Sequence, residues 1–366
     1  MINSKFAAPA GALFALALTL GTAQAQDKVV NVYNWSDYID ESILEDFEKE
    51  TGIKVVYDVF DSNEVLETKL LAGGTGYDVV VPTASFLARQ IQAGVFQKLD
   101  KSKLPNLKNM WDVVEKRTAT YDPGNQYAVN YMWGTTGIGY NEDKILERMP
   151  DAPVNSWRML FDPEVVSKFA DCGIHVLDAP TELIPAALNY IGEDPDSHDP
   201  KVIEKAEPVL MAIRPYIQKF HSSEYINALA NGDICLALGW SGDVLQARDR
   251  ADEANNGVTV KYVIPDEGAL MWFDMMAIPA DAPHPENALT FLNYMMRPEV
   301  IAKASNYVYY ANGNKASQQF LNEDVIGDPA IYPNQAALSR LYTTSPYPPN
   351  VQRVVTRLWT KVKSGQ

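Results

Sequence analysis

In three segments of this chain an apolar run ends in tryptophan and an aspartate follows within three residues: Trp35-Ser36-Asp37-Tyr38, Trp240-Ser241-Gly242-Asp243 and Trp272-Phe273-Asp274. A carboxylate pairs with an ammonium group, while a neighbouring indole covers alkyl carbon and adds a cation–π attraction of about 0.5–2 kcal/mol. One such pair carries little information, because most tryptophans lie in a core and most aspartates are solvated. Three pairs that converge would suit a molecule with several ammonium groups joined by methylenes, which is a polyamine.

Alternating strand and helix patterns would position these residues. The strands are expected at Val29–Tyr33, Ile53–Phe60, Tyr77–Val81, Gly173–Leu177, Ile234–Leu238, Val258–Ile264 and Leu270–Ile278. Helical spacing is expected at Ile39–Phe47, Ser62–Ala72, Phe86–Ala93, Thr181–Tyr190, Asp243–Glu253, Pro285–Met296 and Val351–Lys363. Such alternation predicts an α/β fold with a parallel, doubly wound sheet covered by helices on both faces.

Ligands of such sheets bind just beyond the carboxyl ends of the strands. Four polar segments occupy that position here: Trp35–Tyr38, Pro82–Ser85, Asp178–Glu182 and Trp240–Asp243. Their shared placement makes them candidates for one site.

The start of the chain resembles a cleaved export signal. Lys5 is followed by an apolar stretch over residues 10–20 and by Ala23-Gln24-Ala25, so we expect a signal peptide over residues 1–25 and a mature chain that begins at Gln26. The apolar stretch is shorter than the roughly 20 residues that span a membrane. The expected location is the bacterial periplasm. The net charge of −16 disfavours nucleic acid and anionic membranes as partners and mildly favours cationic ligands.

The chain has two cysteines, Cys172 and Cys235. In an oxidising compartment, an even pair predicts a structural disulfide. The alternatives are a redox pair or metal ligands, but there is no C-x-x-C motif and no nearby pair of histidines.

Enzyme motifs are incomplete. Gly239-Trp240-Ser241-Gly242-Asp243 approaches a nucleophile elbow but lacks the final glycine, and Gly73-Gly74-Thr75-Gly76 precedes a strand rather than a helix. The four histidines are scattered without metal-ligand spacing: His175, His198, His221 and His284. We therefore expect no catalytic residue, no cofactor and no metal. A receptor for another cationic solute and an enzyme that acts on a bound amine remain as alternatives.

At this point a family resemblance is visible. The mature chain resembles the periplasmic polyamine-binding proteins that serve bacterial spermidine/putrescine ABC transporters. The matching segments include Tyr33-Asn34-Trp35-Ser36-Asp37-Tyr38, Tyr77-Asp78-Val79-Val80-Val81-Pro82, Thr136-Gly137-Ile138-Gly139-Tyr140-Asn141, Leu177-Asp178-Ala179-Pro180, Asn231-Gly232-Asp233, Gly239-Trp240-Ser241-Gly242-Asp243 and Tyr310-Ala311-Asn312.

The resemblance implies a two-lobed periplasmic binding protein of the type II kind, with the ligand cleft between the lobes. The expected first lobe is 26–133 plus 254–307, and the second is 134–253 plus 308–366. A monomer that delivers polyamine to a membrane ABC permease is expected.

The resemblance also implies roles for individual residues. Aromatic side chains would surround the methylenes: Trp35, Tyr38, Trp240, Trp272 and Tyr310. Carboxylates would pair with ammonium groups: Asp37, Glu182, Asp243 and Asp274. Ser36 and Thr83 would add acceptors, where threonine departs from the more usual serine, and Ser85 would help decide ligand length. Because phenylalanine at the position of Trp272 is associated with putrescine-preferring relatives, tryptophan there predicts a preference for spermidine over putrescine. The alternative is a putrescine-preferring receptor, since the chain otherwise resembles the putrescine-type branch of the family.

Overall fold

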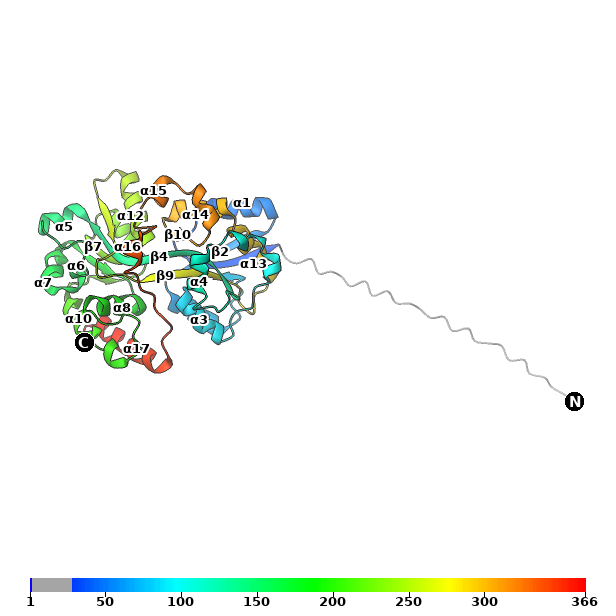
Figure 1. Ribbon diagram of the computed structural model, residues 1–366, viewed down its shortest axis with the longest axis horizontal. Coiled ribbons are helices and arrows are strands. Elements are labelled where there is room, and N and C mark those ends of the chain that lie inside the picture. The colour runs from blue at the N-terminus through cyan, green and yellow to red at the C-terminus, as the bar shows by residue number, and fades with distance from the viewer. Residues whose placement is uncertain (2–27) are drawn as a thin grey trace.

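The structure is a computed structural model that describes Met1 and residues 28–366. Apart from Met1, the expected signal peptide lies outside the described residues. Figure 1 shows two α/β halves side by side, connected by strands that run from one half into the other. This arrangement agrees with the predicted two-lobed α/β fold.

Within the described residues, ten strands form one continuous sheet in the order β2-β1-β3-β9-β4-β7-β5-β6, with β10 and β8 also paired to β4. The outer ladders are parallel, namely β1 with β2 and β3, and β5 with β6 and β7. The central ladders through β9 and β4 are antiparallel, so the sheet is mixed rather than purely parallel. The strands are β1 (Val29–Trp35), β2 (Lys54–Phe60), β3 (Val79–Val80), β4 (Ala128–Asn141), β5 (Ile174–Val176), β6 (Lys219–Phe220), β7 (Leu236–Trp240), β8 (Val260–Val263), β9 (Met271–Ala277) and β10 (Ala311–Asn312).

Strand β4 joins the two halves. Its first part pairs with β9 as far as Thr135, and its second part pairs with β7 from Thr136 onward. Every residue of β4 is buried. A strand buried on both faces shows no alternation of polar and apolar residues, which explains why β4 is absent from the expected strands.

Helices cover the sheet in both halves (Figure 1). The first group is α1 (Glu41–Thr51), α2 (Asn63–Ala72), α3 (Ala84–Gln92), α4 (Asp112–Thr118), α13 (Pro285–Met295), α14 (Pro298–Val308), α15 (Glu323–Ile326) and α16 (Gln335–Leu338). The second is α5 (Glu142–Arg148), α6 (Arg158–Phe161), α7 (Pro163–Val166), α8 (Pro180–Tyr190), α9 (Pro200–Ile203), α10 (Ala206–Ile213), α11 (Glu224–Ala230), α12 (Ser241–Ala254) and α17 (Pro349–Ser364). Short 3₁₀ helices lie at Lys101–Lys103, Pro105–Asn109, Ser167–Cys172, Arg214–Tyr216 and Lys315–Phe320.

Two apolar cores divide the chain in a way that differs from the expected boundaries in two segments. Residues 258–269 pack on the second core through Val260 and Ala269, because β8 pairs with the second part of β4. The segment after 308 returns to the first core, where Tyr310, Val325 and Ile331 are buried. We therefore propose lobes of about 28–135 plus 270–340 and 136–269 plus 345–366.

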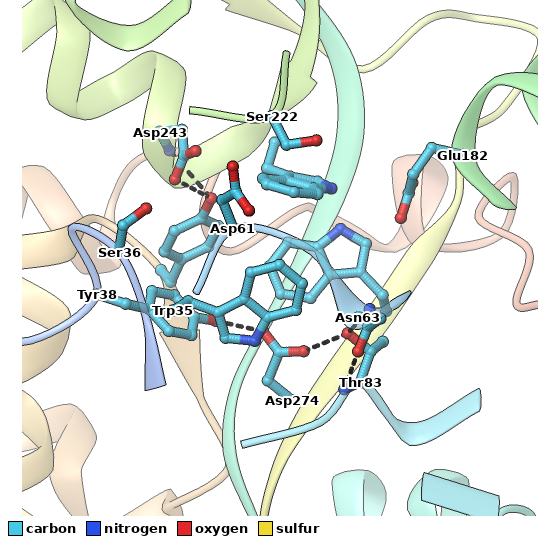
Figure 2. A pocket seen from close by; sticks show the side chains of 13 residues that line it. Trp35, Ser36, Tyr38, Asp61, Asn63, Thr83, Glu182, Ser222, Asp243 and Asp274 are labelled. Carbon is cyan, nitrogen blue, oxygen red and sulfur yellow. Dashed lines mark hydrogen bonds between the residues drawn. The ribbon is translucent and has the colours of Figure 1, made fainter. Parts of the chain in front are cut away.

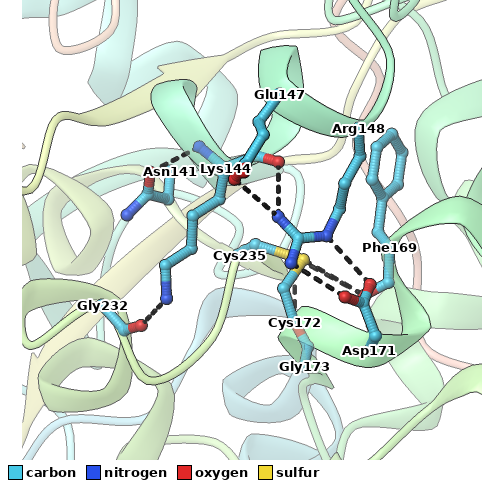
Figure 3. Close-up of a disulfide and its surroundings, with 10 residues drawn as sticks. All are labelled: Asn141, Lys144, Glu147, Arg148, Phe169, Asp171, Cys172, Gly173, Gly232 and Cys235. Carbon is cyan, nitrogen blue, oxygen red and sulfur yellow. Dashed lines mark hydrogen bonds and ion pairs between the residues drawn. A yellow bond between two sulfur atoms is a disulfide. The ribbon is translucent and has the colours of Figure 1, made fainter.

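The predicted disulfide is present in the second lobe. Cys172 at the end of a 3₁₀ helix bonds Cys235, just before β7, with Cα atoms 5.5 Å apart. Figure 3 shows the bond beside the ion pair of Arg148 with Asp171. Among the described helices, none combines the length and apolar character needed to cross a membrane.

Candidate ligand-binding cavity

A cavity of about 450 Å³, part of it open to solvent, lies where the two lobes meet. Figure 2 shows its side chains converging from both lobes. Ten of the twelve predicted site residues line it: Trp35, Ser36, Tyr38, Thr83, Glu182, Trp240, Asp243, Trp272, Asp274 and Tyr310. The same wall contains Asp61, Asn63 and Ser222.

Two of the three tryptophan–aspartate segments reach the cavity from a strand end. Trp35 is the last residue of β1, and Trp240 ends β7 directly before α12, whose first turn carries Asp243. The third segment lies within a strand, as expected from the strand pattern over Leu270–Ile278: Trp272 and Asp274 are both inside β9. Side chains two residues apart on a strand point to the same face, so Trp272 and Asp274 both reach the cavity from β9.

Aromatic rings form the walls. Trp35 and Trp240, from opposite lobes, meet edge to face with centroids 5.5 Å apart. Tyr310 packs against Trp272 at 5.3 Å and against Tyr38 at 5.1 Å. The indole Nε1 of Trp35 donates to the carbonyl of Val81 at 2.9 Å. These contacts fix the rings before any ligand is present.

Two glycines allow these rings to lie where they do. A Cβ on Gly134 would approach the Trp272 ring to 2.8 Å, and a Cβ on Gly242 would approach the Tyr310 ring to 2.4 Å. Such distances are shorter than van der Waals contact, so any larger residue would displace a wall of the cavity.

Asp243 is 7% exposed and is held by two phenols. Tyr225 donates to one carboxylate oxygen at 2.8 Å, and Tyr310 donates to the other at 2.7 Å. Both donors are neutral, and each leaves the remaining lone pairs of the carboxylate free for another partner. Asp243 is therefore oriented as an acceptor for a group inside the cavity.

Asp274 has the same arrangement in the first lobe. It is 4% exposed, and it accepts from the Thr83 hydroxyl at 2.7 Å and from the Tyr38 phenol at 2.8 Å. Figure 2 shows these bonds beside the Trp35 ring. Asp243 in the second lobe and Asp274 in the first lobe thus each accept hydrogen bonds from two hydroxyl groups.

Glu182 lies in the first turn of α8 and is 9% exposed. It accepts from the Thr136 hydroxyl at 2.6 Å, and that hydroxyl accepts from the indole Nε1 of Trp272 at 3.2 Å. Trp272 therefore both lines the cavity and orients the group that holds Glu182.

Three buried carboxyl groups that line the cavity have raised pKa values. Burial raises the pKa of Glu182, Asp243 and Asp274 to about 7 each, although the hydroxyl donors oppose the shift. No lysine, arginine or histidine is among the described residues that line the cavity. Ionised carboxylates buried without a cation are costly, so the cavity favours a ligand that brings positive charge.

Asp37 is not among the residues that line the cavity. Its carboxylate pairs with Arg250 on α12 at 2.7 Å, while its carbonyl accepts a hydrogen bond from the side chain of Gln246. Its backbone has a positive φ of 54°, and its ion pair with Arg250 joins the first lobe to the second. Arg250 supplies the cation that the sequence reasoning expected from a ligand.

Ser85 is also outside the main cavity. It lies in the first turn of α3 and lines a neighbouring hollow that shares Thr83, Glu182 and Trp272 with the cavity. A role for Ser85 in ligand length therefore stays a prediction.

Sequence reasoning missed five residues. Asp61 and Asn63 follow β2, so the strand-end rule could have identified them. Ser222 follows the two-residue strand β6, which is too short to recognise from a pattern. Thr136 and Tyr225 support carboxylates from within a strand and a helix, and their residue types give no signal.

Comparison with known proteins identifies a matching protein family and similar proteins. Residues 42–333 match the model of the bacterial extracellular solute-binding protein family. The chain is 56% identical to the putrescine-binding periplasmic protein SpuD of Pseudomonas aeruginosa, over 96% of this chain and 98% of that protein. It is 53% identical to the putrescine-binding periplasmic protein PotF of Escherichia coli, over 98% of this chain and 96% of that protein.

More distant relatives match most of the chain. The chain is 35% identical to a spermidine/putrescine-binding periplasmic protein of Escherichia coli, over 87% of this chain and 88% of that protein. Among solved structures, a putative spermidine/putrescine ABC transporter from Listeria monocytogenes superposes with a TM-score of 0.81 at 31% identity, covering 93% of this chain and 100% of that chain.

Proposed function

Since this chain belongs to the family of bacterial extracellular solute-binding proteins, we propose that it captures a short aliphatic diamine of the putrescine type and delivers it to a membrane ABC importer. A chain of this family is a binding protein rather than an enzyme, so the site must hold its ligand and release it unchanged.

One observation carries the proposal: three buried carboxyl groups face one cavity and receive only neutral donors. Each ammonium group of a diamine would offer a counter-charge, and without it a buried charge costs several kcal/mol. The methylenes between the ammonium groups would gain about 0.8 kcal/mol each against the indole and phenol walls. Asp243 and Asp274 belong to different lobes, which suits a ligand with one cation at each end.

The length of the ligand is the finer part of the proposal. The expected preference for spermidine rested on the size of the Trp272 ring. In the structure that ring packs over Gly134 and Tyr310 and fills space at the cavity wall. Two relatives above 50% identity are described as putrescine-binding. These observations support the alternative, a receptor that prefers putrescine to spermidine.

Calorimetric titration of protein freed from bound amine would test the proposal. We expect putrescine to bind more tightly than spermidine or agmatine, and 1,4-butanediol, which has the same carbon chain without charge, to show no binding. A relative of 43% identity is described as putrescine/agmatine-binding, so agmatine belongs in the series. Tighter binding of spermidine would reverse the proposed length preference, and equal binding of butanediol would overturn the role of the carboxylates.

Location and assembly complete the proposal. The relatives are described as periplasmic, which supports export of this chain to the periplasm and cleavage near Gln26. We propose a monomer that docks on an ABC permease. Mass spectrometry of the chain recovered from the periplasm would identify its first residue, and light scattering would give its mass in solution. An uncleaved chain in the cytoplasm would contradict the proposed location.

A further inference from the structure

Thr83 occupies a helix cap but does not cap the helix. It is the N-cap residue of α3, and its side chain makes no cap hydrogen bond. Threonine at this position ordinarily accepts a hydrogen bond from a backbone N–H of the first turn, which stabilises the helix. Its hydroxyl instead donates to Asp274 Oδ1 at 2.7 Å. A cap residue beside a binding site that makes no cap hydrogen bond indicates that its side chain serves the site instead of the helix.

Asn63 contacts the same threonine through two hydrogen bonds. The backbone N–H of Thr83 donates to Asn63 Oδ1 at 3.0 Å, and Asn63 Nδ2 donates to Thr83 Oγ1 at 2.9 Å. Because a backbone N–H can only donate, the atom opposite it must be the amide oxygen, and this fixes the orientation of the Asn63 amide. Figure 2 shows Asn63, Thr83 and Asp274 in a row along the cavity wall.

The hydroxyl of Thr83 has one proton, so its direction matters. The amide of Asn63 can only donate to Oγ1, which leaves the Thr83 proton free for Asp274. Asn63 is not needed to cap its own helix, since Ser62 is the N-cap of α2 and accepts from the backbone N–H of Val65. Its amide therefore has no other role among these contacts.

We propose that Asn63 is a positioning residue for the cation site, which fixes the Thr83 hydroxyl as a donor to Asp274 and so holds that carboxyl ready to accept an ammonium group. The inference rests on the proposed amine-binding function. Asn63 acts on the ligand through Thr83, by orienting a proton, rather than through charge.

The groups that face Asp274 define what a change at Asn63 would do. They are the phenols of Tyr38 and Tyr131 and the carboxyl groups of Glu182 and Asp243. None of these groups is a cation, so the hydroxyl donors Thr83 and Tyr38 stabilise the ionised form of Asp274. Loss of the Thr83 donor should raise the pKa of Asp274 further, because burial already raises it and the Thr83 bond opposes that shift.

A double-mutant cycle with Asn63→Ala and Thr83→Val tests the proposal by calorimetric titration with putrescine at pH 8. Thr83→Val removes one hydrogen bond to a charged group and should weaken binding about 10- to 100-fold. Asn63→Ala leaves the hydroxyl free to turn and should weaken binding about 3- to 10-fold. If Asn63 acts through the hydroxyl, Asn63→Ala in the Thr83→Val background should add less than about twofold.

The pH profile separates positioning from a merely structural effect. In Asn63→Ala, the loss of putrescine affinity on acidification should begin at a higher pH than in the wild type, and Thr83→Val should remove this difference. Asn63→Gln keeps an amide but displaces it by one methylene, and it serves as a second variant if the alanine variant does not fold.

Each outcome decides a different question. Additive losses in the cycle, or an unchanged affinity and pH profile in Asn63→Ala, would overturn the positioning role. Failure of the wild-type protein to bind putrescine or any related amine would instead overturn the proposed function, and that result is obtained before any variant is compared.

Discussion

Replacement of Asp243 by asparagine should remove most of the affinity for a diamine. The side chain is 7% exposed and lies between Tyr225 and Tyr310 at 2.8 and 2.7 Å. Asparagine keeps its size and one acceptor oxygen, so the cavity keeps its shape while one negative charge disappears. The ammonium group that lies nearest to Asp243 would then be buried without a counter-charge.

The expected loss follows from that burial. Truncation of one partner of a buried, hydrogen-bonded charge pair costs about 2–5 kcal/mol. Because about 1.4 kcal/mol corresponds to a tenfold change in affinity, the dissociation constant should rise about 30- to several thousand-fold. Titration calorimetry at pH 8 is the appropriate assay, since the pKa of Asp243 is raised to about 7 and the wild-type carboxyl is mostly ionised there.

Asp37→Asn is the matched control, because it removes the same charge from a carboxylate that pairs with Arg250 instead of lining the cavity. Side-chain exposures of 38% and 33% make this a surface ion pair, which contributes about 0–1 kcal/mol. The control should therefore change affinity by less than about fivefold. Equal losses in the two variants, or normal binding by Asp243→Asn, would refute the assignment of the cavity carboxylates.

Three further predictions concern pH, the cavity wall and the disulfide. Burial raises the pKa of Glu182, Asp243 and Asp274 to about 7, and the ammonium groups need ionised partners, so putrescine affinity should fall from pH 8 to pH 5. Putrescine affinity should fall by up to about tenfold per pH unit for each carboxyl group that must lose a proton on binding. An affinity that does not change with pH would contradict this prediction. In the ligand-free protein the same raised pKa values mean that the folded state binds more protons than the unfolded state, so these groups should make the melting temperature fall as pH rises from about 4 to 7. Trp272→Phe removes ring area and the donor to Thr136, and it should weaken putrescine by about 1–2 kcal/mol in the same titration; unchanged binding would leave Trp272 as packing alone. Replacing Cys172 and Cys235 by alanine opens a loop with a sequence separation of 63 and should lower the free energy of unfolding by about 4 kcal/mol in denaturant titrations, while putrescine affinity stays close to that of the wild type.

The sequence alone predicted the α/β fold class, the disulfide and ten of the residues that line the cavity. Strand and helix periods are local properties, and the end of a parallel strand is where the chain leaves the sheet, so Trp35 and Trp240 could be placed from their position in the pattern. Residue chemistry then indicated a cation, because carboxylates beside indoles have few other uses at converging strand ends. The disulfide could be predicted because the chain has one pair of cysteines and its expected compartment is oxidising.

Only the tertiary structure decided how the charges are paired. The side chain of Asp37 turns to Arg250, which lies 213 residues away along the chain, and no local pattern specifies such a contact. Strand β4 was missed because burial on both faces removes the alternation that marks a strand. The hydroxyl groups of Tyr225, Thr136 and Thr83 hold the carboxyl groups from separate elements. Hydrogen bonds of this kind depend on distance and direction in space, and the sequence specifies these only through the complete fold.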